Sequence, residues 1–90
     1  MELEWDEDKR QKNLRERGID FASFSDIDMQ TAFTAQDNRT DYGEVRFITF
    51  GFIAERLHVA CWTRREERIR VISLRKANER EKALYADLAG

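Results

Sequence analysis

The 90-residue chain has no proline, one cysteine and one histidine. Because a disulfide needs two cysteines, Cys61 cannot form one within the chain, and one cysteine with one histidine cannot supply a usual zinc site. No apolar run approaches the roughly 20 residues with which a helix crosses a bilayer, and the acidic first residues do not resemble a signal peptide. We therefore expect a soluble, cytoplasmic protein without a cofactor or a membrane partner. Only magnesium held by carboxylates stays open.

The composition is typical of a small folded domain. Ninety residues predict a single domain over residues 1–90 with one modest core. Hydrophobic residues make up 41% of the chain and aromatic residues 11%, so disorder is not expected. Charged residues make up 38% and predict a strongly solvated surface.

The formal net charge of -2 hides an uneven distribution of charge along the chain. Residues 1–44 carry 12 Asp and Glu against 6 Lys and Arg, whereas residues 45–90 carry 6 against 10. This split predicts one acidic surface and one basic surface, and the basic surface would suit nucleic acid. The alternative is that solvated charges are simply scattered unevenly.

Local patterns predict helices near both ends of the chain. A first helix is expected within residues 5–18, because Asp6 is a good N-terminal cap and Gly18 can close the helix in the left-handed conformation. Apolar residues recur near helical spacing in residues 19–29, which predicts a second short helix lying on a sheet. The sparse apolar stripe of residues 76–88 predicts a closing helix.

Strand patterns occupy the middle of the chain. Residues 44–52 are rich in β-branched and aromatic side chains, and residues 56–63 and 67–74 follow after short connections. These three segments predict an antiparallel meander, with a charged turn at residues 64–66. A weaker fourth strand is expected at residues 31–36. The predicted fold class is therefore α+β.

The last predicted strand is rich in arginine. Strand alternation would place Arg68 and Arg70 side by side on one surface, where they repel each other unless carboxylates or a bound polyanion neutralise them. Planar guanidinium donors suit phosphate, so a phosphate-bearing partner is the first hypothesis. The alternative is a set of ion pairs that holds the last helix to the sheet. Its acidic partners would be Glu66, Glu67, Glu79 or Glu81.

Residues spread along nearly the whole chain match a known family. They are Trp5, Asp6, Lys9, Asn13, Gly18, Ile19, Phe21, Gly43, Glu44, Arg46, Gly51, Thr63, residues 68–73, Arg75, Ala77, Glu81 and Tyr85. In this order and spacing the chain resembles the BrnT family of bacterial toxins. The most specific parts are the run R-I-R-x-I-S-x-R-x-A that closes the sheet and the opening W-D-x-x-K.

The resemblance implies a RelE-like fold with N-terminal helices, an antiparallel sheet of three to four strands and a C-terminal helix. It also implies an endoribonuclease toxin of a type II toxin–antitoxin module, which inhibits translation by cutting RNA. A BrnA-like antitoxin would neutralise the toxin, and operator DNA would be bound only through that antitoxin. The family often ends its first helix with a basic residue, histidine and glycine, whereas this chain has Glu16, Arg17 and Gly18. Arg17 can hold a phosphate but cannot act as a general base near neutral pH.

Metal-independent cleavage needs positive charge around the phosphate, and arginines can provide it. If the strand faces match, Arg46, Arg64, Arg68 and Arg70 converge on one pocket. We therefore predict Arg46, Arg68, Arg70, Glu44 and Tyr85 as catalytic residues and Lys9, Arg64 and Arg75 as RNA-binding residues.

Several of these residues have a structural alternative. Glu44 is a candidate base, but it is also placed to form an ion pair with Arg46. Tyr85 can contact RNA or anchor the last helix. His58, the only side chain whose ordinary pKa lies near neutrality, lies outside the matching residues and is more typical of a surface or core-edge position. The alternative function is a non-catalytic protein that keeps the fold and binds an antitoxin-like partner.

Overall fold

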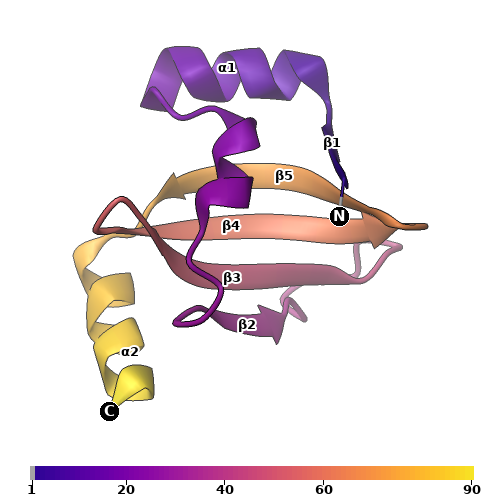
Figure 1. Cartoon of the computed structure of the whole chain (residues 1–90). Helices are drawn as coiled ribbons and strands as arrows, with labels where there is room; N and C mark the ends of the chain where they lie inside the picture. Colours follow the sequence, from indigo (N-terminus) through magenta and orange to yellow (C-terminus); the bar gives the residue numbers. More distant parts are fainter. Residues whose placement is uncertain (1) are drawn as a thin grey trace.

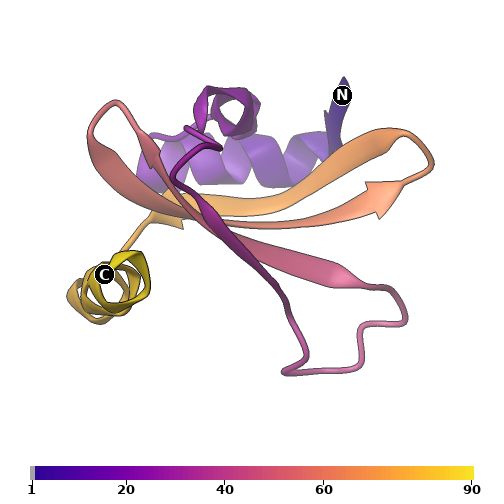
Figure 2. The same cartoon turned by 60° about the horizontal axis from the view of Figure 1, so that its bottom comes forward.

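The computed structural model describes residues 2–90, which form a five-stranded mixed sheet with helices on both faces (Figure 1). The elements are β1 (Glu2–Trp5), α1 (Glu7–Arg17), the 3₁₀ helix η1 (Phe21–Asp26), β2 (Phe33–Gln36), β3 (Arg46–Ile53), β4 (Arg56–Arg65), β5 (Arg68–Lys76) and α2 (Glu79–Ala89). The strand order is β1-β5-β4-β3-β2. We call the two sides of the sheet the η1 face, which α1 and η1 cover, and the α2 face (Figure 2).

The sheet differs from the expected one at its outer edge. β2 to β5 are antiparallel neighbours, as predicted, but β1 adds a fifth strand that runs parallel to β5. The expectation of three to four antiparallel strands is therefore wrong for the strand number and the sheet type. β1 was missed because only Leu3 and Trp5 carry its alternating pattern, and its partner strand lies far along the chain.

The predicted helix boundaries are largely confirmed. The Asp6 side chain accepts hydrogen bonds from the backbone N–H groups of Asp8 and Lys9, and Gly18 closes α1 with a φ of 68°. The second short helix exists, but as η1 rather than as an α-helix. α2 begins later than expected, because Asn78 caps it through reciprocal hydrogen bonds with Glu81. No helical segment in residues 2–90 is long and apolar enough to span a bilayer.

The main core lies between η1 and the sheet. Its most buried side chains include Phe21, Val71 and Leu74. Trp62 packs edge-on against Phe24 and stacks on Phe47. A smaller cluster under α2 contains Leu57, Val59 and Ala77, with Tyr85 packed against it. The α2 face is therefore covered by a helix over only part of its area (Figure 2).

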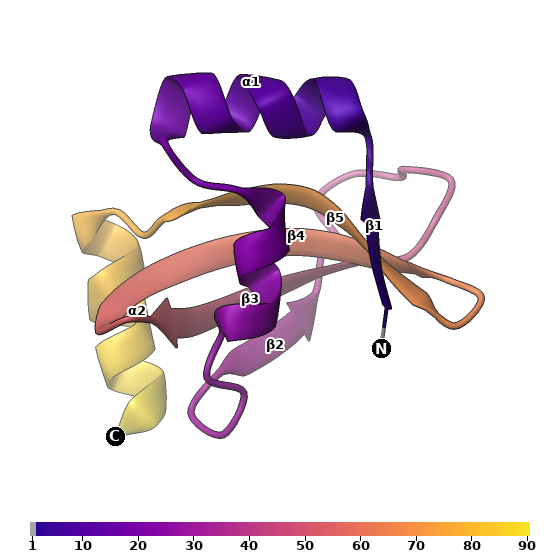
Figure 3. The ribbon, with the colours of Figure 1, turned by 45° about the horizontal axis from the view of Figure 1, so that its top comes forward.

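Within residues 2–90, the outer side of β5 has no strand partner beyond the end of β1. β1 pairs with β5 only as far as Val71. Figure 3 shows that β1 lies beside only one end of β5. At that point the β4–β5 register shifts, because Cys61 pairs with Ser73 while Trp62 pairs with Val71. Ile72 is left as an extra residue in a β-bulge. Among residues 2–90, no strand pairs with the outer side of β5 from Ile72 to Lys76.

Candidate functional site

The α2 face brings together four of the predicted arginines. Arg46 pairs with Thr63, Thr63 pairs with Arg70, and directly paired residues of a sheet point to the same side. Arg68 lies two residues before Arg70, so alternation places it on the same face. Arg75 pairs with Val59 of the cluster beneath α2. Arg46, Arg68 and Arg70 therefore share one face, but the hollows described below do not bring them together in the single pocket that was predicted.

Arg64 does not join this group. It pairs with Ile69, which packs against the core beneath η1, so its side chain lies on the opposite face. The expectation that Arg64 converges with the other arginines is wrong, because alternation within each strand does not say which faces coincide across strands. His58 is also on the η1 face. It is 6% exposed, and its Nδ1 lies 2.8 Å from the carbonyl oxygen of Arg56.

Carboxylates from other segments pair with the arginines of β5. Arg70 donates to Glu4 at 2.7 Å, and Arg68 lies 3.3 Å from Glu2. These two ion pairs join β1 to β5. The ion-pair alternative is thus present for both arginines, but with partners other than those expected from the sequence. Arg68 and Glu2 are both more than half exposed, so their pair contributes little to stability.

Arg75 is the arginine that ties α2 to the sheet. Its two Nη atoms donate to the two carboxylate oxygens of Glu81, both at 2.7 Å. This bidentate pair raises the pKa of Arg75 and lowers the pKa of Glu81, chiefly through the shared hydrogen bonds. Glu81 was expected as a partner of Arg68 or Arg70, but its arginine is Arg75.

Within residues 2–90, Arg46 is paired through its Nε atom alone. Its Nε donates to Glu44 at 3.1 Å, which confirms the structural ion pair, and Arg65 lies 3.7 Å from the same carboxylate. The guanidinium carbon of Arg46 lies 4.0 Å from the ring centre of Tyr42. The two Nη atoms of Arg46 make no hydrogen bond within the described residues. These two atoms are free to donate to a ligand on this face.

A buried carboxylate organises the loop that positions Tyr42. The Asp37 side chain is fully buried and accepts hydrogen bonds from the guanidinium of Arg39, at 2.8 and 2.9 Å, and from the hydroxyl of Tyr42 at 3.1 Å. The bonds from Arg39 hold the pKa of Asp37 well below its usual range. In the sequence, the aspartate two residues before an arginine was the one available signal of this contact.

A hollow of about 380 Å³ lies on the α2 face between this loop and α2. We call it the α2-face hollow. Its lining residues are Arg39, Ile48, Phe50, Val59, Cys61, Ser73, Arg75, Glu81 and Leu84. Apolar side chains therefore lie beside two guanidinium groups. Burial raises the pKa of the Cys61 thiol, which keeps this side chain neutral at physiological pH.

Tyr85 occupies the anchoring position that was its structural alternative. Its hydroxyl donates to the carbonyl oxygen of Thr31 at 2.6 Å. Its ring meets Phe33 and Phe52 edge-on, with centroid distances of 5.4 and 5.2 Å. Tyr85 therefore holds α2 against the opposite edge of the sheet from β5. It does not line the α2-face hollow.

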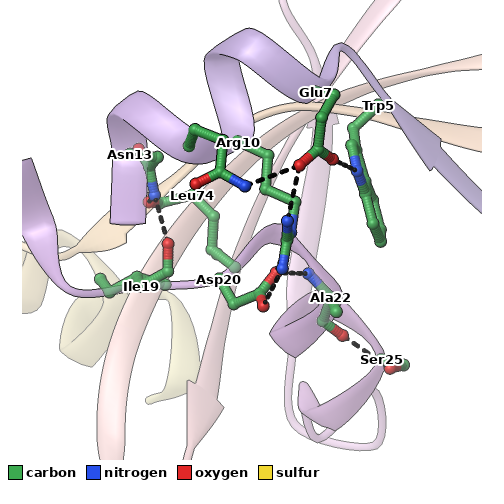
Figure 4. A network of polar contacts seen from close by, with 10 residues as sticks. Trp5, Glu7, Arg10, Asn13, Ile19, Asp20, Ala22, Ser25 and Leu74 are labelled. Atoms are coloured by element: carbon green, nitrogen blue, oxygen red, sulfur yellow. Dashed lines mark hydrogen bonds and ion pairs between the residues drawn. The ribbon is translucent and has the colours of Figure 1, made fainter. Parts of the chain in front are cut away.

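Polar contacts fix α1 to its neighbours (Figure 4). Asn13 donates to the carbonyl oxygens of Ile19 and Leu74, both at 2.9 Å, and so joins α1 to β5. Arg10 holds the carboxylate of Asp20 with two hydrogen bonds of 2.9 Å. Beyond Asn13, the helix and β5 enclose a second hollow of about 260 Å³, which we call the α1 hollow. Its lining residues are Lys9, Lys12, Asn13, Glu16, Arg17, Phe21, Ile72 and Ser73.

Comparison with known proteins identifies the family. A family model described as the ribonuclease toxin BrnT of type II toxin–antitoxin systems matches residues 5–81. The chain belongs to the BrnT family. No curated protein matches it with significant similarity. BrnT membership makes the chain one of a family of ribonuclease toxins that act with an antitoxin partner.

Most residues that carry the BrnT resemblance build the fold. Gly51 is one example, because a Cβ atom there would overlap Cγ2 of Ile27. Thr63 is another, since its hydroxyl donates to the carbonyl oxygen of Val45 at 2.6 Å. Two other matching residues have no such structural contact in the described part of the chain. Lys9 forms no ion pair with a carboxylate of residues 2–90. Ser73 lines both hollows.

Proposed function

We propose that this BrnT-family chain is a metal-independent endoribonuclease that inhibits translation and binds RNA on the α2 face. The observation that carries the proposal is the placement of Arg46, Arg68 and Arg70 on one surface, with the Nη atoms of Arg46 available. Guanidinium groups here supply the positive charge that a metal ion supplies in metal-dependent nucleases. The family supplies the ribonuclease class.

The chemistry proposed is an internal transfer of the phosphoryl group. The ribose 2′-oxygen attacks phosphorus and loses its proton, the bond to the 5′-oxygen breaks, and that oxygen gains a proton. The products carry a 2′,3′-cyclic phosphate and a 5′-hydroxyl. Negative charge grows on the phosphate oxygens in the transition state, where preorganised cationic donors stabilise it. Arg46 is the leading candidate for this role, with Arg68 and Arg70 beside it.

Glu44 is the candidate base. Its carboxylate lies 3.1 Å from the Nε of Arg46 on the α2 face and can accept the 2′-hydroxyl proton. His58 does not serve in this role, because it is buried on the opposite face and its ring is held by the backbone.

The partner proposed is a BrnA-like antitoxin that covers the α2 face. Membership of a type II toxin–antitoxin family supports a protein antitoxin. An acidic segment of that partner would compete with Glu4 and Glu44 for the arginines, as a phosphate would. Operator DNA would be contacted through the antitoxin. A RelE-like ancestry of this single domain is part of the same proposal, with β1 as an addition to the sheet.

One observation favours the second candidate, a non-catalytic protein that binds an antitoxin-like partner. Within residues 2–90, each arginine of the α2 face has a carboxylate within 4 Å, so the surface is already largely neutralised. A fold that uses its arginines only in this way would bind a protein without cutting RNA.

Incubation of the purified protein with RNA in EDTA separates the two candidates. The ribonuclease proposal expects cleavage that persists in EDTA and leaves 2′,3′-cyclic phosphate and 5′-hydroxyl ends. Cleavage that EDTA abolishes, or that leaves 5′-phosphate ends, would contradict the metal-independent route. Absence of cleavage by folded protein would support the binding protein.

Expression in growing cells tests the biological part of the proposal. We expect translation and growth to stop when the chain is produced, and to recover when the product of the neighbouring gene is supplied. Growth that continues despite accumulation of folded protein would contradict a toxin. The matched control is a chain with Arg46→Gln.

A further inference from the structure

The cations of the α1 hollow differ from those of the α2 face, because they have no acidic partner. Lys9, Lys12 and Arg17 form no ion pair within the described residues. They lie at helical spacing along α1 and line one hollow, whose only carboxylate is that of Glu16. Asn13 is committed to two backbone carbonyl groups. The hollow therefore holds uncompensated positive charge, which attracts an anion.

The two hollows share one lining residue, Ser73. At this residue no strand of residues 2–90 pairs with the outer side of β5, because β1 stops pairing with β5 at Val71. An extended chain can therefore cross the edge of the sheet here without displacing a strand.

We propose that a single RNA strand crosses the free edge of β5 at Ser73, with a backbone phosphate in the α1 hollow and a neighbouring nucleotide in the α2-face hollow. This inference rests on the proposed ribonuclease function. It adds Lys12, Arg17 and Arg39 to the residues that contact RNA, and it gives Lys9 a partner. The path leads from α1, over the sheet edge, towards Arg46.

The α2-face hollow has the chemistry of a nucleotide site. Its volume of about 380 Å³ and its apolar floor, which includes Ile48, Phe50 and Val59, suit a base. Arg39 and Arg75 supply donors for a phosphate at its rim. The positive charge of Arg39 lowers the pKa of Arg75 and so opposes the larger effect of Glu81, because the two guanidinium groups repel each other. A phosphate between them would relieve that repulsion.

Arg39 is preorganised for this role. Its Nε and one Nη atom are bound to the buried carboxylate of Asp37, while 72% of the side chain stays exposed. The guanidinium is thus held in place before RNA arrives, which lowers the entropic cost of binding. Its remaining donors are available at the rim of the hollow.

Binding of a short RNA whose 2′-hydroxyls are methylated, and which therefore cannot be cleaved, tests the path. Affinity is measured over a range of salt concentrations for the intact chain, Lys12→Gln, Arg39→Gln and the double variant. Each single change should weaken binding about 5- to 10-fold and lower the salt slope by about 0.7, the value for one phosphate contact on a single strand. The double variant should lose both contributions. The control is Arg80→Gln, an exposed cation of α2 with no ion pair in residues 2–90, which should leave binding unchanged.

The outcomes separate this inference from the proposed function. If the intact chain neither binds nor cuts RNA, the ribonuclease proposal fails. If it does both, but Lys12→Gln binds as tightly as the intact chain, the strand does not cross the β5 edge and the inference is overturned. It is equally overturned if Lys12→Gln weakens antitoxin binding and leaves RNA binding intact, because the α1 hollow then belongs to the protein partner.

Discussion

Residues matched to the BrnT family divide into those that hold the fold together and those that we propose to contact RNA. Gly51 leaves room for Ile27, Thr63 donates one hydrogen bond to a backbone carbonyl group, and Asn13 donates two. Arg46, in contrast, keeps two nitrogen atoms without a partner in residues 2–90. Changes at the first group should alter stability, and changes at Arg46 should alter activity.

Gly51→Ala should destabilise the fold by about 1–3 kcal/mol, the usual cost of an added methyl group in a packed core. The new Cβ would overlap Cγ2 of Ile27 and lie 3.3 Å from the Cβ of Ala32. Urea denaturation measures the loss. The same substitution should cost less in an Ile27→Ala background, where the overlapping atom is gone. Equal costs in both backgrounds would show that the two residues do not touch.

Comparison of Arg70→Gln with Glu4→Gln separates structure from catalysis at one ion pair. Both variants break the 2.7 Å contact between β1 and β5, so both should lower the melting temperature to a similar extent. Only Arg70→Gln removes a cation from the site, and we expect it to lower RNA cleavage about 100-fold or more. Glu4→Gln should stay within a few-fold of the intact chain. Equal losses of activity would assign Arg70 a structural role alone.

Predictions of which residues share a face were correct when the residues belong to the same strand. Alternation alone correctly placed Arg68 and Arg70 on one face. It failed for Arg64, because the shared face depends on the register between strands, which short patterns do not encode. Arg39 was missed because its position depends on a buried carboxylate in an irregular loop.

Elements with strong local signals were predictable, and those defined by distant partners were not. The caps of α1 and the β-branched segments of β3 to β5 determined their boundaries within a few residues. β4 continues to Arg65 and the following turn lies at Glu66 and Glu67, later than the predicted charged turn. β1 is a strand because it pairs with β5, and the sequence of its four residues does not predict this pairing.

Asn13→Ala should loosen α1 from the sheet. The substitution removes two hydrogen bonds of 2.9 Å and leaves the carbonyl groups of Ile19 and Leu74 without this donor. We expect a loss of about 1–3 kcal/mol in the free energy of unfolding. Amide exchange should also accelerate in α1 more than in β3 and β4. Glu16→Ala, an exposed change on the same helix, is the control and should leave both measurements near those of the intact chain.

The loop at residues 37–45 should weaken in acid. The pKa of Asp37 is lower in the folded chain than its ordinary value near 4, so the folded state binds fewer protons than the unfolded state. The resulting stability is complete above about pH 4 and is lost as the pH falls towards the lowered pKa. Asp37→Asn should therefore be less stable than the intact chain at pH 6, with a smaller gap at pH 3. A constant gap in urea midpoints would contradict this linkage.

Across the whole molecule, the charge split of the sequence does not become two separate surfaces. The expected basic and acidic surfaces are instead interleaved on the α2 face. Glu2, Glu4 and Glu44 belong to the acidic half of the chain, yet they pair with arginines of the basic half. The parallel docking of β1 beside β5 brings two of these carboxylates there. The α1 hollow, in contrast, gathers three cations, Lys9, Lys12 and Arg17, that have no acidic partner in residues 2–90.

The most direct test of the account compares RNA cleavage in EDTA by the intact chain, Arg46→Gln and Arg80→Gln. The account predicts that Arg46→Gln loses about 100-fold or more of the cleavage rate, while its melting temperature changes little and Arg80→Gln remains fully active. Retention of the full rate by folded Arg46→Gln protein would contradict the claim that arginines of the α2 face carry the reaction.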